Sequence, residues 1–380
     1  MFRINLLMKL TVLKENLNRG LSIALKAVAN RPQLPVLAHI LFKTDQGRLK
    51  ISSTDLETGI NLWIGAKISR EGSISIPAKI LTEFVSSLPA GKIDLEAKDN
   101  TLELMTESSR ASFNGLAATE FPKIPSVQGQ PALTIEPADF TKAISQVAFA
   151  AASDETRPVL TGIYFIFKDS KLSLVATDGY RLSLKNFPKT FKLSPEHDLS
   201  KGLIVPARTL QEAARITAEE NKEIKFYLSA DSNQLIFQTG DVEIITRLIE
   251  GKYPEFEKII PAEGKIKTVI DTDEFTRIIK IAAIFARDSA NIVRFKLDKE
   301  GIEVSANTAQ IGENKSVVKT KVEGGEEKIA FNSRYLLDFL SIVGSETFQL
   351  TISDSLSPGV FRSEKDETFL HIIMPVRVQE

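Results

Sequence analysis

The sequence has no cysteine and only three histidines in 380 residues. His39, His197 and His371 are far apart and form no ligand-spaced pair. This pattern excludes or disfavours a Cys/His zinc site, a disulfide framework and a cysteine nucleophile. The lack of cysteine also fits a reducing compartment. We therefore expect neither a metal nor a cofactor.

The sequence also lacks a long hydrophobic run and a phosphate-binding G-x-x-x-x-G-K-[ST] loop. Residues 1–13 are apolar, but Arg3, Asn5 and Lys9 interrupt them, so they fall short of the roughly 18 apolar residues of a membrane span. We expect a cytoplasmic protein without a membrane partner that does not hydrolyse ATP by itself. Met8 is a second possible start.

Composition and charge are those of an ordinary globular protein. The chain is 43% hydrophobic and 26% charged, and its formal net charge is −1. This length favours two to four domains rather than a single core. The near-zero charge gives no general reason to expect a nucleic-acid partner, and any basic surface must be offset by acidic surface elsewhere.

Residues 172–184, L-S-L-V-A-T-D-G-Y-R-L-S-L, predict a β-hairpin. Apolar residues alternate with polar ones from 172 to 176 and again from 182 to 184, so we expect one apolar face through both arms. Asp178 and Gly179 predict a tight two-residue turn with positive φ angles.

Similar patterns recur in each third of the chain. A strand and an amphipathic helix open each third, and a second helix follows later. Equivalent positions are Leu17, Phe140 and Phe275 in the first helix and Pro77, Pro206 and Asn332 at the start of the second. Offsets of about 120 to 135 residues have the size of a domain rather than of a solenoid repeat.

We therefore predict three copies of one module. The predicted boundaries are 1–128, with 1–7 a possible extra tail, then 129–262 and 263–380, and the Pro-rich linkers are 121–131 and 253–265. Each copy reads as an α+β domain with two helices against antiparallel sheets. Exposed sheet edges at the ends would let two chains close head to tail into a ring.

Four segments resemble the bacterial DNA polymerase III beta subunit family, the sliding clamps. They are R-P-x-L-P at 31–35, V-A-T-D-G-Y-R-L at 175–182, Y-P-x-x-x-x-I-I-P at 253–261 and M-P-V-R-V at 374–378. The resemblance covers nearly the whole chain from Met8 and includes the threefold repeat. It implies a non-catalytic, head-to-tail homodimer whose helices line a hole for duplex DNA of any sequence.

The resemblance also implies a pocket between the second and third domains for short linear motifs. The expected partners are the DNA polymerase III alpha subunit, the clamp loader, other polymerases and repair proteins. The pocket residues would be Arg157, Leu160, Thr177, Gly179, Tyr180, Arg181, Leu182, Pro254, Ile259, Tyr335, Met374, Pro375, Val376 and Arg377. Apolar members would anchor a leucine or phenylalanine, and the arginines would fix carboxylates.

Several positions depart from the family pattern. Tyr180 stands where histidine is common, Lys258 where arginine is common and Pro358 where a small polar residue is usual. The chain also continues to Gln379 and Glu380, beyond the usual end. Each change puts a detail of partner binding in doubt.

The match also assigns DNA-facing and subunit-contact residues. The DNA-facing set is Lys14, Arg19, Lys26, Arg31, Lys79, Arg208, Arg215, Arg277 and Lys280, and the dimer contact is Phe113 with Ile284 and Phe285. Sparse cations that contact phosphates would bind without sequence preference and permit sliding. Taken without the resemblance, these are equally solvated helix faces and core residues.

Three alternatives remain open. Residues 374–378 can be a last strand that docks on its own sheet. The protein can be a repeat-built adaptor that never encircles DNA, in which case light scattering would find a monomer. It can also be a metal-dependent phosphodiesterase using Asp55 and Asp178, although these belong to different modules and no third carboxylate stands at ligand spacing.

Overall fold

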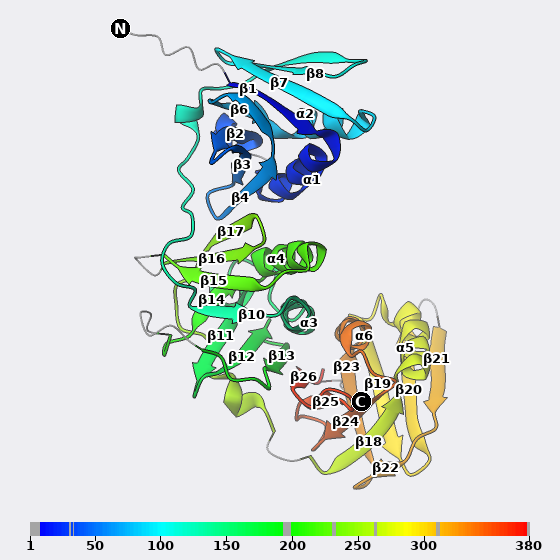
Figure 1. Ribbon diagram of the computed structural model, residues 1–380. Helices are drawn as coiled ribbons and strands as arrows, with labels where there is room; N and C mark the ends of the chain where they lie inside the picture. The colour runs from blue at the N-terminus through cyan, green and yellow to red at the C-terminus, as the bar shows by residue number, and fades with distance from the viewer. Residues whose placement is uncertain are drawn as a thin grey trace. The chain divides into compact units, whose positions relative to one another are not determined.

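The computed structural model describes residues 8–29, 32, 34–192, 199–229, 233–261, 264–308 and 312–377 (Figure 1). These residues form two compact units, the first drawn from 1–141, 192–197 and 212–248 and the second from 142–191, 198–211 and 249–380. The middle third of the chain is thus divided between the units. The helices are α1 (Lys14–Ala24), α2 (Ala78–Ser87), α3 (Pro137–Ala148), α4 (Ala207–Glu220), α5 (Thr272–Ala286) and α6 (Ser333–Ile342).

The first unit contains two antiparallel sheets. One has the order β5 (Lys67–Arg70), β1 (Met8–Leu13), β7 (Lys92–Lys98), β8 (Thr101–Met105), β9 (Arg110–Asn114). The other has the order β10 (Leu133–Ile135), β15 (Ile224–Leu228), β16 (Gln234–Thr239), β17 (Val242–Arg247), β4 (Thr58–Gly65), β3 (Arg48–Thr54), β2 (His39–Asp45), β6 (Ser73–Pro77).

The second unit repeats this plan. Its larger sheet has the order β14 (Leu203–Pro206), β11 (Gly162–Lys168), β12 (Lys171–Thr177), β13 (Arg181–Asn186), β26 (Phe369–Ile373), β25 (Gly359–Ser363), β24 (Thr347–Ile352), β18 (Ile266–Asp271), β22 (Val322–Glu323). The smaller has the order β21 (Gly312–Val318), β20 (Gly301–Thr308), β19 (Ile292–Asp298), β23 (Glu327–Asn332).

The helices begin where the sequence predicts. α1, α3 and α5 each follow a strand, and their equivalent residues Leu17, Phe140 and Phe275 are fully buried. α2, α4 and α6 begin directly after Pro77, Pro206 and Asn332. Proline suits this position because it fixes φ, and the Asn332 carboxamide caps α6 by accepting from Arg334 N at 2.9 Å. The threefold α+β repeat is therefore confirmed.

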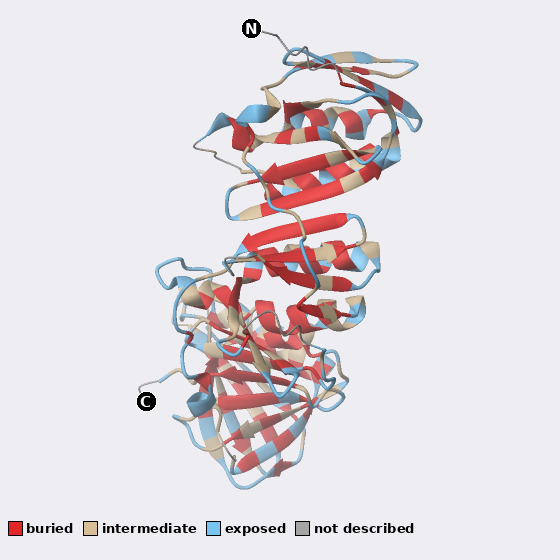
Figure 2. Cartoon of the chain, turned by 60° about the vertical axis from the view of Figure 1, so that its left-hand side comes forward, coloured by how far each residue is buried: buried red, intermediate tan, exposed pale blue. Residues whose placement is uncertain are grey.

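Both large sheets are continuous across a module boundary. In the first junction β4 pairs with β17, and in the second β13 pairs with β26. Each junction thus joins the outgoing strand of a module's central hairpin to the last strand of the next module. Buried residues follow these strands, whereas exposed residues gather in loops (Figure 2). The predicted domain limits remain predictions.

One expectation about the central hairpin is wrong. Residues directly opposite each other share a face, and Ala176 pairs with Ser183 while Thr177 pairs with Leu182. The apolar sets of the two arms therefore lie on opposite faces of the sheet. Both faces are covered, so Val175 and Lys185 are buried as well.

No helix in the described part of the chain is long and apolar enough to cross a membrane. The stretch before Met8 lies outside the described residues.

Candidate functional site

The turn of the central hairpin is held by two side chains. Thr177 Oγ1 accepts from Gly179 N at 3.0 Å and donates to Arg181 O at 2.6 Å. Asp178 Oδ1 accepts from the backbone N–H groups of Tyr180 and Arg181 at 2.8 and 3.0 Å. Within 177–181 only Gly179 has a positive φ, +91°. The turn is therefore centred on Gly179 and Tyr180, one residue later than predicted, and Tyr180 is 60% exposed at its tip.

The first module repeats these bonds residue for residue. Thr54 Oγ1 accepts from Leu56 N at 3.0 Å and donates to Thr58 O at 2.9 Å, and Asp55 Oδ1 accepts from Glu57 N and Thr58 N at 3.0 and 2.7 Å. Asp55 and Asp178 are thus turn-forming residues. In the described part of the chain, no three His, Cys, Asp or Glu side chains gather as metal ligands. The phosphodiesterase alternative therefore has no support in the site.

Arg181 links the turn of the central hairpin to helix α6. Its Nε donates to Asp178 Oδ2 at 3.0 Å and its Nη1 to Asp338 Oδ2 at 2.5 Å. The guanidinium lies 4.5 Å from the ring centre of Tyr335. Burial and the Asp178 carboxylate raise the pKa of the Tyr335 phenol. Since Arg181 is paired with two carboxylates and its side chain is only 11% exposed, it positions Tyr335 on α6 more than it offers charge to a ligand.

Two further arginines remain accessible. Arg157 Nη2 donates to Asp178 O at 3.0 Å, although the residue is exposed. Arg377 is also exposed. These two guanidinium groups, rather than Arg181, are the cations that a carboxylate of a partner could reach.

The remaining residues predicted for the pocket divide into buried and accessible ones. Leu160, Thr177 and Leu182 are at most 5% exposed, so a partner can reach little of their side chains. Tyr180, Pro254 and Ile259 are exposed, and Tyr335, Met374, Pro375 and Val376 are half-buried. Only this second group can touch a partner directly.

The alternative of a last strand at 374–378 is wrong, because the last strand is β26 and the described residues 374–377 that follow it are not a strand. These residues still dock on the chain through two backbone hydrogen bonds. Met374 N donates to Tyr180 O and Val376 N to Ala330 O, both at 2.8 Å. The docking leaves the side chains of both residues partly accessible. It therefore places Met374 beside the Tyr180 turn. Pro254 and Ile259 lie on the linker, where their neighbours Tyr253 and Phe256 pack in the cluster that contains Leu182.

The departures from the family pattern have local consequences. Lys258 pairs with Glu255 at 2.5 Å and is 80% exposed in its side chain. Pro358 lines a small cavity described below. Gln379 and Glu380 lie outside the described residues.

Three family models match successive parts of the chain. Models of the N-terminal, central and C-terminal domains of the DNA polymerase III beta subunit match residues 8–125, 134–255 and 257–377. The chain belongs to the DNA polymerase III beta subunit family. The three matched segments correspond to the threefold repeat.

Relatives within this family match the chain from end to end. A beta sliding clamp of Synechococcus elongatus is 30% identical over 98% of this chain and 100% of the relative. That of Bacillus subtilis is 31% identical over 97% and 100%. A crystal structure of the Bacillus subtilis clamp has a TM-score of 0.91 at 27% identity, covering 98% and 100%. A Pseudomonas aeruginosa clamp bound to griselimycin has a TM-score of 0.89 at 26% identity, with the same coverage.

The predicted DNA-facing residues lie on or beside helices. All are exposed except Lys14, which is intermediate, and Arg31, which lies outside the described residues. Arg19 pairs with Glu220, and Lys26 and Arg215 pair with Glu212 at 3.7 and 2.8 Å. Lys14, Lys79, Arg208, Arg277 and Lys280 form no ion pair with another described residue. These five cations are better candidates for phosphate contacts than Arg19, Lys26 and Arg215.

The predicted subunit contacts lie on an edge strand, β9, and on a helix, α5. Phe113 is on the edge strand β9, only 9% exposed because Phe84 of α2 packs against it at 5.6 Å. Ile284 on α5 is 51% exposed, and its neighbour Phe285 packs against the core of the third module. Phe113 thus needs little rearrangement to become fully buried, whereas Ile284 is free to contact a partner.

Sequence reasoning missed several residues that build the second junction. Asp338 lies three residues after Tyr335 on α6, a helical spacing that could have revealed it. Tyr253 accepts from Thr177 N at 3.1 Å, and burial raises the pKa of its phenol. The cluster of Lys142, Lys185 and Asp366 gave no signal, because its members are distant in sequence and look like surface charges.

Proposed function

We propose that the chain is a non-catalytic DNA sliding clamp that closes into a ring with a second copy of itself. The observation that carries the proposal is the shared register of the two junctions. Each module offers the outgoing strand of its central hairpin, and each following module receives it on its last strand. In the described chain, two of these strands have no such partner and lie at sheet edges. They are β21, the outgoing strand of the third module, and β9, the last strand of the first module.

The register of the missing junction follows from the other two. Ser53, Ala176 and Ala306 occupy equivalent positions in the three modules. Their partners across the hairpin are Ile60, Ser183 and Asn314, which are therefore equivalent positions on the outgoing strands. In the same way, Leu104, Phe237 and Phe361 are equivalent, and their partners Ala111, Ile244 and His371 are therefore equivalent positions on the last strands.

Across the two existing junctions, equivalent residues pair. Ile60 lies opposite Ile244, and Ser183 lies opposite His371. By this rule Asn314 of one copy lies opposite Ala111 of the other, and Glu313 lies opposite Ser112. The same register brings Phe113 to the α5 side of β21, where Ile284 is exposed.

Closure rather than affinity would keep the protein on DNA. Lys14, Lys79, Arg208, Arg277 and Lys280 supply sparse, sequence-independent phosphate contacts that weaken with salt and allow sliding. The Tyr180 turn, Ile259 and Met374 would receive short apolar motifs of polymerases and of the clamp loader, with Arg157 and Arg377 as carboxylate contacts.

The absence of native cysteine allows a direct test. Ser112→Cys with Glu313→Cys places two thiols directly opposite at a Cα separation of about 4.5–5.5 Å, which a disulfide accepts. Oxidation is expected to give a covalent dimer of twice 42.0 kDa. The control pair, Ser112→Cys with Asn314→Cys, is shifted by one residue and points to opposite faces, so it should cross-link poorly.

The ring itself is tested on DNA. After loading onto a nicked circle with a matching clamp loader, the cross-linked dimer should stay bound in high salt and leave when the circle is cut. Equal loss from circular and linear DNA would contradict encirclement. A chain that stays monomeric under oxidation, with neither cysteine pair cross-linked, would favour the adaptor.

A further inference from the structure

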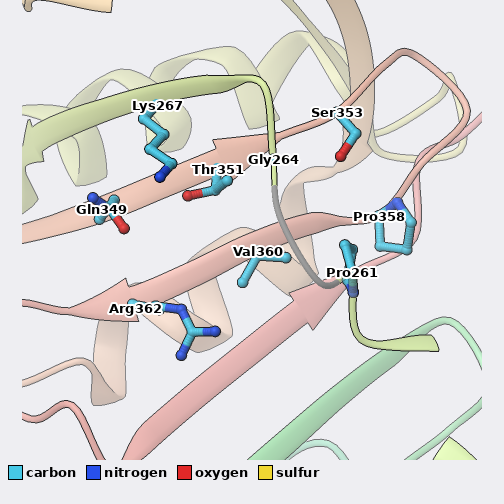
Figure 3. A pocket seen from close by; sticks show the side chains of 9 residues that line it. All are labelled: Pro261, Gly264, Lys267, Gln349, Thr351, Ser353, Pro358, Val360 and Arg362. Atoms are coloured by element: carbon cyan, nitrogen blue, oxygen red, sulfur yellow. The ribbon is translucent and has the colours of Figure 1, made fainter. Parts of the chain in front are cut away.

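A small cavity lies on the sheet face of the third module, away from the proposed DNA-facing helices. It has a volume of about 120 Å³ and is lined by residues of β18, β24 and β25 together with the preceding linker. Figure 3 shows Pro261 and Pro358 at one end and Gln349 and Arg362 at the other, with Lys267 extending toward Thr351. The lining is therefore mostly polar and carries two cations.

Neither cation is neutralised within the described chain. Lys267 and Arg362 form no ion pair within 4.0 Å of a described carboxylate. Glu323, the register partner of Lys267 on β22, forms its ion pair with Lys321 instead, at 2.6 Å. Gln349 and Thr351 add hydrogen-bond donors between the cations. This donor set fits a carboxylate.

The cavity is joined to the pocket residues by one cross-strand row. Lys267 pairs with Thr351, Thr351 with Val360, Val360 with Ile372 and Ile372 with Leu182. Four strand spacings of about 4.8 Å separate Lys267 from Leu182, and Arg362 is two strands from β13. An extended segment covers these roughly 10 to 19 Å with about three to six residues.

The linker brings the two sites closer at the surface. Pro261, which lines the cavity, follows the exposed Ile259 by two residues. An apolar side chain bound at Ile259 would therefore lie two linker residues from the cavity lining.

We propose that this cavity is an acidic subsite of the partner-peptide pocket, which receives an Asp or Glu side chain about three to six residues from the apolar anchor. The inference rests on the proposed function and adds a specificity element to it. A nucleic-acid backbone is a poorer fit, because it would need a track of cations, whereas this cavity offers two within an otherwise neutral lining.

The test compares two synthetic peptides that share a Leu-Phe anchor. One carries two aspartates about four residues away, and the other carries asparagines there. At low salt the acidic peptide should bind the full-length protein about tenfold more tightly by fluorescence anisotropy. In the double variant Lys267→Gln with Arg362→Gln this ratio should fall to about one, with the Kd of the neutral peptide unchanged.

The matched control removes two charges elsewhere in the same module. Lys299→Gln with Lys319→Gln, both exposed, should keep the tenfold ratio. Glu323→Gln should increase it. An unchanged ratio in the Lys267 and Arg362 variant overturns the subsite alone, whereas failure of both peptides to bind overturns the pocket and the subsite together. Loss of single-stranded DNA binding in that variant, with the peptide ratio intact, also overturns it.

Discussion

The two module junctions share a register but have opposite chemistry on their faces. On the helix side, the first junction pairs Ile60 with Ile244 and Leu62 with Val242, whereas the second pairs Ser183 with His371 and Lys185 with Phe369. On the opposite face of each sheet, which the linker covers, the first junction is polar and the second is apolar. Asn61 faces Glu243 in the first junction, and leucines Leu184 and Leu370 face each other in the second.

The polar groups of each junction are matched locally. Asn61 Nδ2 donates to Glu243 Oε2 at 3.3 Å and to Pro125 O at 3.1 Å, so the linker closes the first junction. In the second junction, Lys185 Nζ and Lys142 Nζ lie 2.7 and 2.8 Å from Asp366 Oδ2. Both junctions therefore bury polar side chains, but on different faces.

This difference in side chains disfavours the pairing of a module with the wrong neighbour. If β13 paired with β17 in the common register, Lys185 would face Val242 on the helix side, away from Asp366. A buried cation without a counterion is far less stable than the native pairing. The shared backbone register thus permits every junction, and the side chains select the correct one.

The largest expected effect comes from removing the centre of the second junction. Asp366→Asn leaves the 8%-exposed Lys185 ammonium without its carboxylate, so we expect a loss of about 3–5 kcal/mol in the free energy of unfolding of the second unit. The counterpart in the first junction, Glu243→Gln, keeps a hydrogen-bond acceptor for Asn61 and should cost about 1 kcal/mol.

The single tryptophan separates the two units in this experiment. Trp63 lies in the first unit, where its Nε1 donates to Asp45 Oδ2 at 2.7 Å. In urea titrations, Asp366→Asn should shift the circular dichroism transition and leave the Trp63 fluorescence transition in place. A shift of the fluorescence transition by the same amount would mean that the junctions do not differ in this way.

A smaller effect is expected from pH, and again only in the second junction. His371 is fully buried, and burial with the nearby Arg181 charge lowers its pKa to about 3. The unfolded chain binds a proton near pH 6.5 and the folded chain does not, so His371 lowers stability as pH falls from 6.5 toward 3. Between pH 7.5 and 4.5 this amounts to about 3 kcal/mol.

His371→Asn should therefore flatten the pH dependence of unfolding, although it lowers stability at pH 7.5 by leaving a small cavity. Asparagine retains a partner for Ser183 Oγ, which is 2.8 Å from His371 Nδ1. His39 provides the control, since its Nδ1 also meets a serine hydroxyl, Ser75 Oγ at 3.0 Å, but the ring is only half-buried. Burial lowers the pKa of His39 as well, so His39→Asn should flatten the pH dependence less than His371→Asn does. Asp366 does not interfere, because hydrogen bonds from Lys142 and Lys185 outweigh its burial and hold its pKa well below its usual range.

The sequence was sufficient for the repeat and the helix starts, because both depend on local patterns. Leu17, Phe140 and Phe275 identify the buried helix face, and Pro77 and Pro206 mark helix starts. Buried pairing across modules could not be predicted in the same way. Lys185 and Asp366 are far apart in the chain, and nothing local distinguishes them from solvated charges.

The candidate pocket shows the same limit. The motifs predicted which residues belong to the pocket but not which of them a partner can reach, since Leu160, Thr177 and Leu182 are buried while Tyr180 and Ile259 remain accessible. Composition and spacing do not report which side of a strand is covered. The error over the faces of the central hairpin has this cause: alternation gives the period of each arm, and only the register relates one arm to the other.

The smallest predicted effects test the two equivalent hairpin turns with opposite signs. Leu56 has φ +80° and Gly179 has φ +91° at the same turn position. A leucine is strained in this region and glycine is not. Since Leu56 is 54% exposed and buries little surface, Leu56→Gly should stabilise the first unit by up to about 1 kcal/mol.

Gly179→Ala should destabilise the second unit by about 1 kcal/mol. The added Cβ would lie 3.0 Å from Arg157 Nη1, which is the end of a flexible side chain and can move, so the cost should come mainly from φ. Urea denaturation followed by fluorescence for Leu56→Gly and by circular dichroism for Gly179→Ala measures both. Effects of the same sign would show that the matched hydrogen bonds do not impose the same backbone geometry on the two turns.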